Sequence, residues 1–239
     1  MAMRLVFRPL PVFTLCAAVA FALLVSLGVW QVQRLHWKLG LIAQVNRALA
    51  LPPVSLDEAL KMGKGAAYRR VALSGRFDNA GEVYVYATAD GAPVYHVLVP
   101  FIGDDGRVMI VDRGIVPPEL RDPKTRAAGL LAGERRVAGV WRTPDAPGLF
   151  TPAPDYDRRV WHLPDAKSIA AFEHLKLAAP AVVEADATPN PGGWPKGGQT
   201  RVAFRNEHLQ YAITWFGLAA ALLGVWLAYH ISKGRLGWR

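Results

Sequence analysis

Two long runs without a single Lys, Arg, Asp or Glu constrain this chain more than any other feature. They cover residues 9–33 and 209–232. About 18 such residues are enough to cross the roughly 30 Å hydrocarbon core of a bilayer as a helix. The sequence therefore predicts two transmembrane helices, at 9–33 and 209–232, with a central region of residues 34–207 between them.

The first run also has features of a secretory signal peptide, because Arg4 and Arg8 precede it. A signal core, however, is about 7–15 residues long and ends at a cleavage site made of small residues. Here the apolar stretch continues to Trp30 without such a site. We therefore expect an uncleaved anchor. The second run has aromatic residues near both ends, which is typical of a helix that crosses both membrane interfaces.

The distribution of charge predicts how the chain lies in the membrane. All 19 acids and 23 of the 28 basic residues lie in the central region, so five cations of the net +9 belong to the tails, residues 1–8 and 233–239. Basic flanks are typical of the cytoplasmic side, and long domains translocate regardless of their charge. We expect both tails in the cytoplasm and the central region in the periplasm. Because much of the excess charge flanks the spans, it does not indicate nucleic-acid binding.

The central region predicts a domain rich in β-strands. Four stretches separated by the turn sequences DNAG, DGA and GDDG have strand character, and their close spacing implies antiparallel pairing. The expected strands are 68–77, 82–89, 93–102 and 107–116, followed by 135–141, 158–163 and 180–185. The fold class is therefore a membrane protein whose two spans flank an α+β domain, mainly an antiparallel sheet or partly closed barrel.

Helical patterns border and interrupt these strands. Apolar residues at a spacing near 3.6 extend the first helix beyond the membrane until Pro52 and Pro53. Ser55 and Glu58 form a capping-box pattern that starts a short helix. Another helix is expected at 165–177.

Common catalytic patterns are missing from the sequence. It contains no GxSxG, GxxxxGK[ST] or GxGxxG, and its six histidines do not have the spacing of a zinc site. We therefore predict a protein that is not an enzyme. The single cysteine, Cys16, lies in an apolar run. One sulfur excludes a redox CxxC or a thiolate metal site within one chain and makes copper delivery improbable. Tails of eight and seven residues also argue against a two-span sensor.

Asp112 and Arg113 end an expected strand in the sequence VDRG. They are compatible with a local ion pair or turn cap, and also with a contact to a partner.

The second span has two different faces at 100° per residue. One face consists of small residues, so a neighbouring helix could approach it closely. It contains Gly217, Ala221, Gly224 and Ala228, and the matching small residues of the first span are Ala18, Ala22 and Ser26. We expect these surfaces to pack together, leaving the opposite face outward. That face contains His208, Ala212, Trp215, Ala219 and Trp226.

His208 is the candidate cofactor ligand on the outward face. A neutral imidazole at a membrane interface above Trp215 could ligate haem iron, while Arg201 and Arg205 pair with the propionates. The alternative is a histidine that only anchors the helix end. On the first span, Trp30, Arg34 and Trp37 share one face, so that a guanidinium can stack on an indole at the headgroup level. This second motif is equally compatible with an ordinary interfacial anchor.

Five collinear segments resemble the Surfeit locus protein 1 family of cytochrome oxidase assembly factors. They are LGVWQVQRLHWK (27–38), SGRF (74–77), VYHVLVPF (94–101), VDRGIVP (111–117) and the long, specific RNEHLQYAITWFGLA (205–219). The resemblance covers nearly the whole chain and includes the two-span layout. Ile115, Val94 and Val99 depart from the residues usual in the family, which leaves a functional role for these three positions in doubt.

The resemblance implies an assembly factor for haem-copper terminal oxidases in a bacterial inner membrane. It implies transient binding of haem a, with His208 matching the family's histidine, and delivery to oxidase subunit I in company with the haem a synthesis machinery. The absence of an Arg- and Ser-rich leader favours a bacterial over a mitochondrial member. The alternative is a membrane scaffold that stabilises an oxidase intermediate without touching haem.

Overall fold

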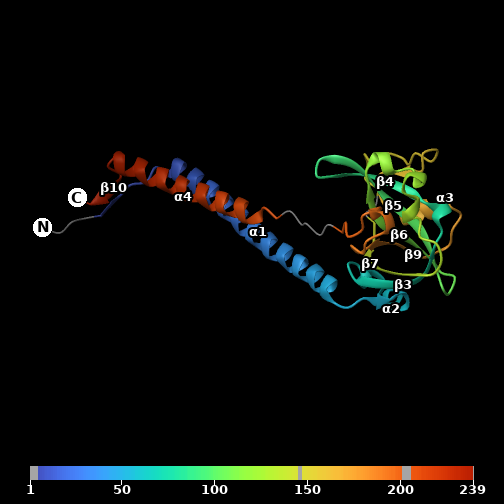
Figure 1. Cartoon of the computed structure of the whole chain (residues 1–239). Coiled ribbons are helices and arrows are strands. Elements are labelled where there is room, and N and C mark those ends of the chain that lie inside the picture. Colours follow the sequence, from blue (N-terminus) through green and yellow to red (C-terminus); the bar gives the residue numbers. More distant parts are fainter. Residues whose placement is uncertain (1–4, 145–146, 201–205, 239) are drawn as a thin grey trace. The chain divides into compact units, whose positions relative to one another are not determined.

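The computed structural model describes residues 5–144, 147–200 and 206–238, which form two compact units (Figure 1). The first unit contains Met1–Gln44 and Ala203–Arg239, and the second contains Val45–Val202. We call the second unit the central domain. The sequence predicts that the transmembrane helices meet the central region at residues 33/34 and 207/209. These limits refer to the surface of a membrane, which contacts within the chain do not mark, so they stay a prediction.

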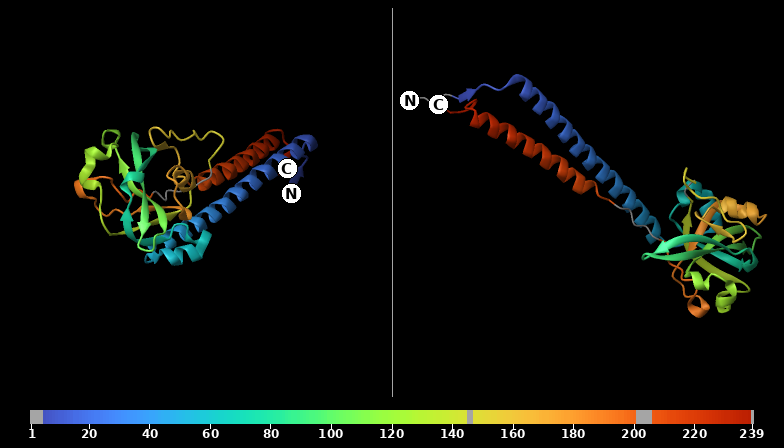
Figure 2. Two further views of the ribbon diagram at one scale, coloured as in Figure 1. Left: turned by 90° about the vertical axis from the view of Figure 1, so that its right-hand side faces the viewer. Right: turned by 90° about the horizontal axis from the view of Figure 1, so that it is seen from above.

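Two helices long and apolar enough to cross a membrane dominate the first unit. Helix α1 covers Pro11–Ala50 and α4 covers His208–Ser232, and an 18-residue stretch of each has a mean hydropathy of 2.5 and 1.7, respectively. As predicted, α1 continues beyond the apolar run and ends just before Pro52. The helices lie side by side and antiparallel (Figure 2), because Thr14 contacts Trp226 and Gln31 contacts His208.

The chain ends continue this pairing outside the helices. Strand β1 (Leu5–Phe7) pairs antiparallel with β10 (Leu236–Trp238), with Phe7 opposite Leu236. The Arg8 amide also donates to the Arg235 carbonyl at 2.8 Å. This two-stranded sheet was not predicted from the sequence.

The central domain is built on a closed five-stranded barrel with additional strands and short helices. Its elements are β2 (Val54–Ser55), α2 (Leu56–Met62), β3 (Arg70–Phe77), β4 (Val83–Ala89), β5 (Ala92–Gly103), β6 (Val108–Val116), β7 (Arg135–Arg142), β8 (Val160–Trp161), α3 (Ala166–Phe172) and β9 (Leu177–Ala185). The sheet order is β2-β3-β7-β9-β6-β5-β4-β8, and an additional β3–β5 pairing closes the barrel. Alternating side chains of the barrel strands, such as Val71, Val99 and Val183, fill its interior.

Local sequence signals account for several elements of this domain. Ser55 and Glu58 form the predicted capping box at the start of α2. Asp90 and Gly91, both at positive φ, make the two-residue turn between β4 and β5. Positive φ at both positions is the geometry of a type I′ hairpin turn.

The structure confirms the α+β class and the strand positions but corrects some pairings. The DNAG turn does not join paired strands, because β3 pairs with β5 and β7 rather than with β4. Strand β9 is antiparallel to β7 but parallel to β6. Such pairings between distant segments depend on barrel closure, which turn chemistry does not encode. The helix expected at 165–177 ends at Phe172, because Leu177 already belongs to β9.

Candidate functional site

His208 is the first residue of α4, and its ring contacts α1. The Nδ1 atom lies 2.7 Å from Oε1 of Gln31, which is buried on α1. A glutamine carbonyl oxygen only accepts hydrogen bonds, so in the neutral ring this contact requires the tautomer in which Nδ1 carries the proton and Nε2 keeps its lone pair. A histidine that ligates a metal has this arrangement, in which the other ring nitrogen donates to an oxygen that orients it.

The face of α4 that contains His208 packs against α1, so the expectation that it faces outward is wrong. Ala212 and Ala219 on this face are only 2% and 3% exposed. Gly217 and Gly224, expected to form the interface, have open space where a Cβ would lie. On α1, Gly28 is the residue that approaches α4, since a Cβ there would lie 2.7 Å from the Phe216 ring.

Polar side chains give a physical reason for this choice of face. Among lipid tails, a polar group has no hydrogen-bond partner except another protein group. His208, Trp226 and His230 all lie on the packed face, and each bonds to α1 or to the residues just before it. Small residues permit close packing, but they do not determine it.

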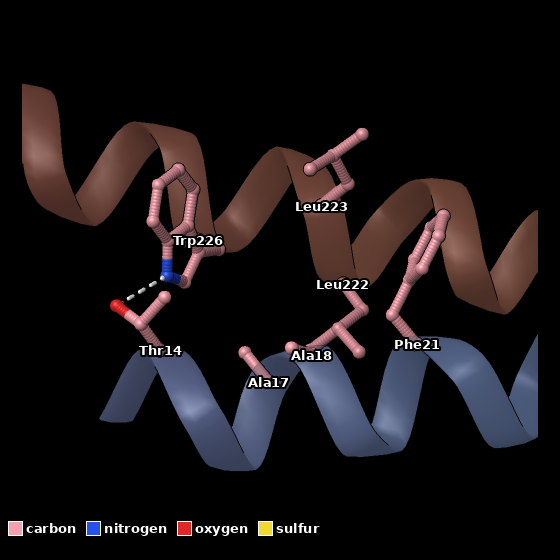
Figure 3. A pocket seen from close by; sticks show the side chains of 7 residues that line it. All are labelled: Thr14, Ala17, Ala18, Phe21, Leu222, Leu223 and Trp226. Carbon is pink, nitrogen blue, oxygen red and sulfur yellow. Dashed lines mark hydrogen bonds between the residues drawn. The ribbon is translucent and has the colours of Figure 1, made fainter. Parts of the chain in front are cut away.

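A small apolar pocket lies between the two helices, toward the end opposite His208 (Figure 3). Its volume is ≈ 250 Å³, and Trp226 Nε1 donates to Thr14 Oγ1 at 3.2 Å on one side of it. Ala17, Ala18, Phe21, Leu222 and Leu223 form the rest of the lining. Trp226 is 18 residues, or about 27 Å of helix, from His208, so the pocket is separate from the histidine.

His230 fastens the other end of α4 and was missed as a contact residue by the sequence analysis. Its Nδ1 donates to the Trp226 carbonyl at 2.8 Å, and its Nε2 accepts from the Leu10 amide at 3.3 Å. The ring also lies 4.2 Å from the Trp226 ring, centroid to centroid. Both nitrogens are therefore in use, so His230 is a structural residue. A histidine four residues after a tryptophan, within an uncharged run, was the available signal in the sequence.

The interfacial motif of α1 is formed in part. The Arg34 guanidinium lies 4.3 Å from the Trp37 ring centroid, which is the predicted stacking. Trp30 and Trp37 are both about half exposed. Arg201 and Arg205, the predicted propionate partners, lie outside the described residues, and Trp215 is partly buried.

Asp112 and Arg113 are adjacent in β6 but have different partners. Asp112 accepts from His96 Nδ1 at 2.7 Å and from the Gly114 amide at 2.8 Å, so it acts as a local cap. Arg113 is 2% exposed, and its Nη2 donates to the Gly129 carbonyl and to Asn190 Oδ1. The two residues form no ion pair with each other.

The sequence analysis missed a buried ion pair elsewhere in the domain. Arg126 pairs with Glu82, and Tyr84 donates to the same carboxylate oxygen at 2.6 Å. Burial and the adjacent carboxylate raise the pKa of Tyr84 well above its usual value. Arg126 and Glu82 are far apart in sequence, so their pairing follows only from the structure. In the part of the chain that the structure describes, no group of three His, Cys, Asp or Glu side chains could hold a metal ion.

Comparison with known proteins identifies the family. The sequence model of the SURF1 family matches residues 18–220. The chain belongs to the SURF1 family. The matched range includes both His208 and Gln31, whereas His230 and the paired tails lie outside it. The contact at His208 therefore joins two residues of the matched range, and the contact at His230 joins two residues outside it.

Curated relatives agree with this assignment. The chain is similar to Surfeit locus protein 1 of Xenopus tropicalis, with 35% identity over 87% of this chain and 72% of that protein. Surfeit locus protein 1 of Takifugu rubripes is 34% identical over 87% of this chain and 92% of that protein. The Homo sapiens protein is 35% identical over 84% of this chain and 72% of that protein.

Proposed function

We propose that this chain is an assembly factor for haem-copper terminal oxidases that holds haem a transiently at His208 and supplies it to subunit I. Membership of the SURF1 family supports a role in cytochrome oxidase assembly. The observation that carries the finer proposal is the 2.7 Å contact between His208 Nδ1 and Gln31 Oε1. In the neutral ring this contact favours the tautomer in which Nε2 can donate its lone pair to iron.

Each residue of the proposed site has a separate task. Bound haem would supply an iron that the His208 imidazole could ligate. Gln31 orients the imidazole, and Trp215 offers an aromatic surface on the same face of α4. Arg201 and Arg205 would pair with the propionates. A single axial histidine limits affinity, which suits a carrier that must release its cargo.

The membrane placement is part of the proposal. We place the chain in a bacterial inner membrane, with both tails in the cytoplasm and the central domain in the periplasm. The two apolar helices are compatible with a membrane protein. Trp30, Arg34 and Trp37 would anchor α1 at the lipid headgroups. In this proposal the chain catalyses no reaction and uses no copper or nucleic acid; its partners are subunit I, the haem a synthesis machinery and lipid.

An absorption spectrum tests the haem ligand. The full chain is purified in a mild detergent from cells that make haem a. We expect a Soret band that is lost in His208→Ala and weakened in Gln31→Leu, which removes the acceptor but keeps the ligand. His36→Ala is the control, because His36 is an exposed histidine of α1. A missing Soret band, or one unchanged in His208→Ala, overturns the ligand assignment.

One observation favours a scaffold without haem as the second candidate. The His208 face already packs against α1, so its role could be limited to holding the helices together. Deletion of the gene, followed by measurement of haem a in the remaining oxidase, tests the role in assembly. A scaffold predicts loss of oxidase without any haem signal from the purified chain. A fully haem-loaded oxidase in normal amount would contradict both candidates.

A further inference from the structure

A pocket of ≈ 290 Å³ in the central domain lies beside Arg113, which forms no ion pair with any acid that the structure describes, although the charge of Glu82 still acts on it. The end of β3, the start of β7 and the segment after β9 surround it. Its apolar walls include Phe77, Leu131, Val137, Pro189 and Pro191. Its charged lining residues are Arg113, Arg135, Arg136 and Asp186, so the lining has an excess of positive charge.

Arg113 is the buried charge of this pocket. It follows Met109 and Val111 at two-residue spacing in β6, so its side chain lies on the face that fills the barrel. The guanidinium lies 4.7 Å from the Phe77 ring centroid, and Nη2 donates to Asn190 Oδ1 at 2.8 Å. Phe77 and Asn190 both line the pocket, so residues of the pocket wall surround the guanidinium.

One nitrogen of this guanidinium donates no hydrogen bond to the residues that the structure describes. Nη1 of Arg113 is buried and has no acceptor among the residues that the structure describes. Nη2 bonds only to neutral oxygens, those of Gly129 and Asn190. A buried charge without an opposite charge is costly, which is why buried ions are normally paired. Arg126, also buried, has Glu82 as its partner.

The guanidinium of Arg113 carries its positive charge at neutral pH. Burial lowers the pKa of Arg113 to about 10, which still leaves the guanidinium protonated at neutral pH. Arg135 and Arg136 are exposed at the start of β7 and lie at the same pocket. Cations at the mouth of a cleft raise the local concentration of anions. The single acid in the lining, Asp186, already accepts from the amide and the hydroxyl of Thr188.

We propose that this pocket binds a small molecule with a carboxylate on an apolar body. The carboxylate would accept a charge-assisted hydrogen bond from Nη1 of Arg113. Binding would require a small movement of the Arg113 side chain, because this atom is closed off from solvent. The apolar body would lie against Phe77, Leu131 and Val137. The volume is near the lower limit of ligand pockets, which restricts the ligand to a small one. All lining residues belong to the central domain, so the proposal is independent of haem at His208.

Calorimetric titration of the full chain in a neutral maltoside detergent tests the proposal, with 3-phenylpropionate as the probe. The matched control ligand is 3-phenylpropanol, which has the same apolar body without the charge. We expect saturable binding of the carboxylate and at least tenfold weaker binding of the alcohol, as expected for loss of a hydrogen bond to a charged group. Equal binding of both ligands, or no saturable binding of the carboxylate, overturns the proposal.

Variants of the pocket locate the binding site. Arg113→Met should abolish carboxylate binding, because it keeps much of the side-chain volume but removes the donor. Should this buried substitution prevent folding, the double variant Arg135→Ala/Arg136→Ala replaces it, since both side chains are exposed. The double variant should bind several-fold more weakly. Arg158→Ala is the matched control, because Arg158 is 75% exposed and does not line the pocket. An unchanged affinity in the double variant, or an equal loss in Arg158→Ala, contradicts the proposal.

Discussion

Buried ionisable side chains in the central domain differ in how their charge is balanced. Arg126 and Glu82 lie together with 2% and 3% of their side chains exposed. Among the residues that the structure describes, Arg113 bonds to neutral oxygens only. Glu184 lies beside Asp112, its register partner in β6, and pairs with Arg142 at 3.3 Å. A charge that is paired when buried becomes costly when its partner is removed. The stability of the domain is therefore sensitive to these few positions.

Removal of Arg126 should destabilise the central domain strongly. We expect Arg126→Met to lower the free energy of unfolding by about 3–5 kcal/mol, because it leaves Glu82 charged and buried without its partner. Thermal unfolding of the full chain measures this effect. The double variant Arg126→Met/Glu82→Leu should recover part of the loss. The exposed pair Arg158–Asp155 is the control, and Arg158→Ala should change stability by about 1 kcal/mol or less. A similar loss of unfolding free energy in Arg126→Met and Arg158→Ala would show that burial does not make the Arg126–Glu82 pair more important than an exposed pair.

The pH dependence of stability should contain a contribution from Glu184. Burial, together with the charge of Asp112, raises the pKa of Glu184, although Thr200, Arg142 and His96 act in the opposite direction. The folded chain therefore holds this proton more tightly than the unfolded chain. Stability falls as pH rises from the ordinary carboxyl value, about 4.3, through the higher folded value.

The Glu184→Gln variant isolates this contribution. Glutamine has no proton to lose, so the difference in melting temperature between the variant and the original chain should grow in favour of the variant as pH rises across that range. Melting curves between pH 4 and pH 8 measure it. A difference that stays constant with pH, or that grows in the opposite direction, would show that the Glu184 pKa is not raised.

At the scale of elements, the two long helices were predictable, but the way they pack was not. Absence of charge over 25 residues predicts a helix long enough to span a membrane, and Pro52 and Pro53 predict where α1 stops. The packed face of α4 depends on polar partners in α1, 177 residues away for the pair His208 and Gln31. Periodicity identifies the two faces of a helix without saying which one meets a neighbour. The candidate ligand His208 was therefore predictable as a residue, whereas its partner was not.

Leucine at Gly28 should weaken the helix pair, whereas leucine at Gly217 should not. A side chain at Gly28 meets the Phe216 ring, while Gly217 has open space around it. Overpacking of this kind typically costs about 1–3 kcal/mol. In a chain with Cys16→Ser, the substitutions Ala17→Cys and Leu222→Cys place thiols on opposite walls of the pocket in Figure 3.

A short bismaleimide then reports on the pairing of the helices. We expect efficient cross-linking in the parent chain and in Gly217→Leu, and a clearly lower yield in Gly28→Leu. Equal yields in all three would show that Gly28 does not set the approach of the helices.

At the scale of the whole molecule, local and distant pairings differ in what sequence can reveal. The turn at Asp90 and Gly91 joins neighbouring strands, and its residues identify it directly. The parallel pairing of β9 with β6 and the pairing of β1 with β10 join segments that are far apart in sequence. Likewise, Arg113 was identified as a candidate from VDRG, but its pocket includes residues from four separate segments, as far as Pro191. The residues of such a site come together only when the chain folds, so the sequence alone does not reveal the site.

The paired tails give a testable distance across the entire chain. Phe7 and Leu236 are opposite each other in the β1–β10 pair. Opposite residues in an antiparallel pair have Cα atoms about 4.5–5.5 Å apart, which suits a disulfide. With Cys16→Ser, the pair Phe7→Cys and Leu236→Cys should oxidise to an intramolecular disulfide, detected by a reducible shift on a gel. Phe7→Cys with Trp238→Cys, two residues out of register, should oxidise much less. Equal oxidation of both pairs would rule out the register.

The same strand pair imposes an order on biosynthesis. Residues of β10 leave the ribosome after both helices and the central domain, so β1 remains without its partner during nearly all of synthesis. Antiparallel association of α1 and α4 brings the two tails together and thereby shortens the loop that the strand pair has to close. The β1–β10 pair can therefore exist only on a chain that has been translated through Trp238.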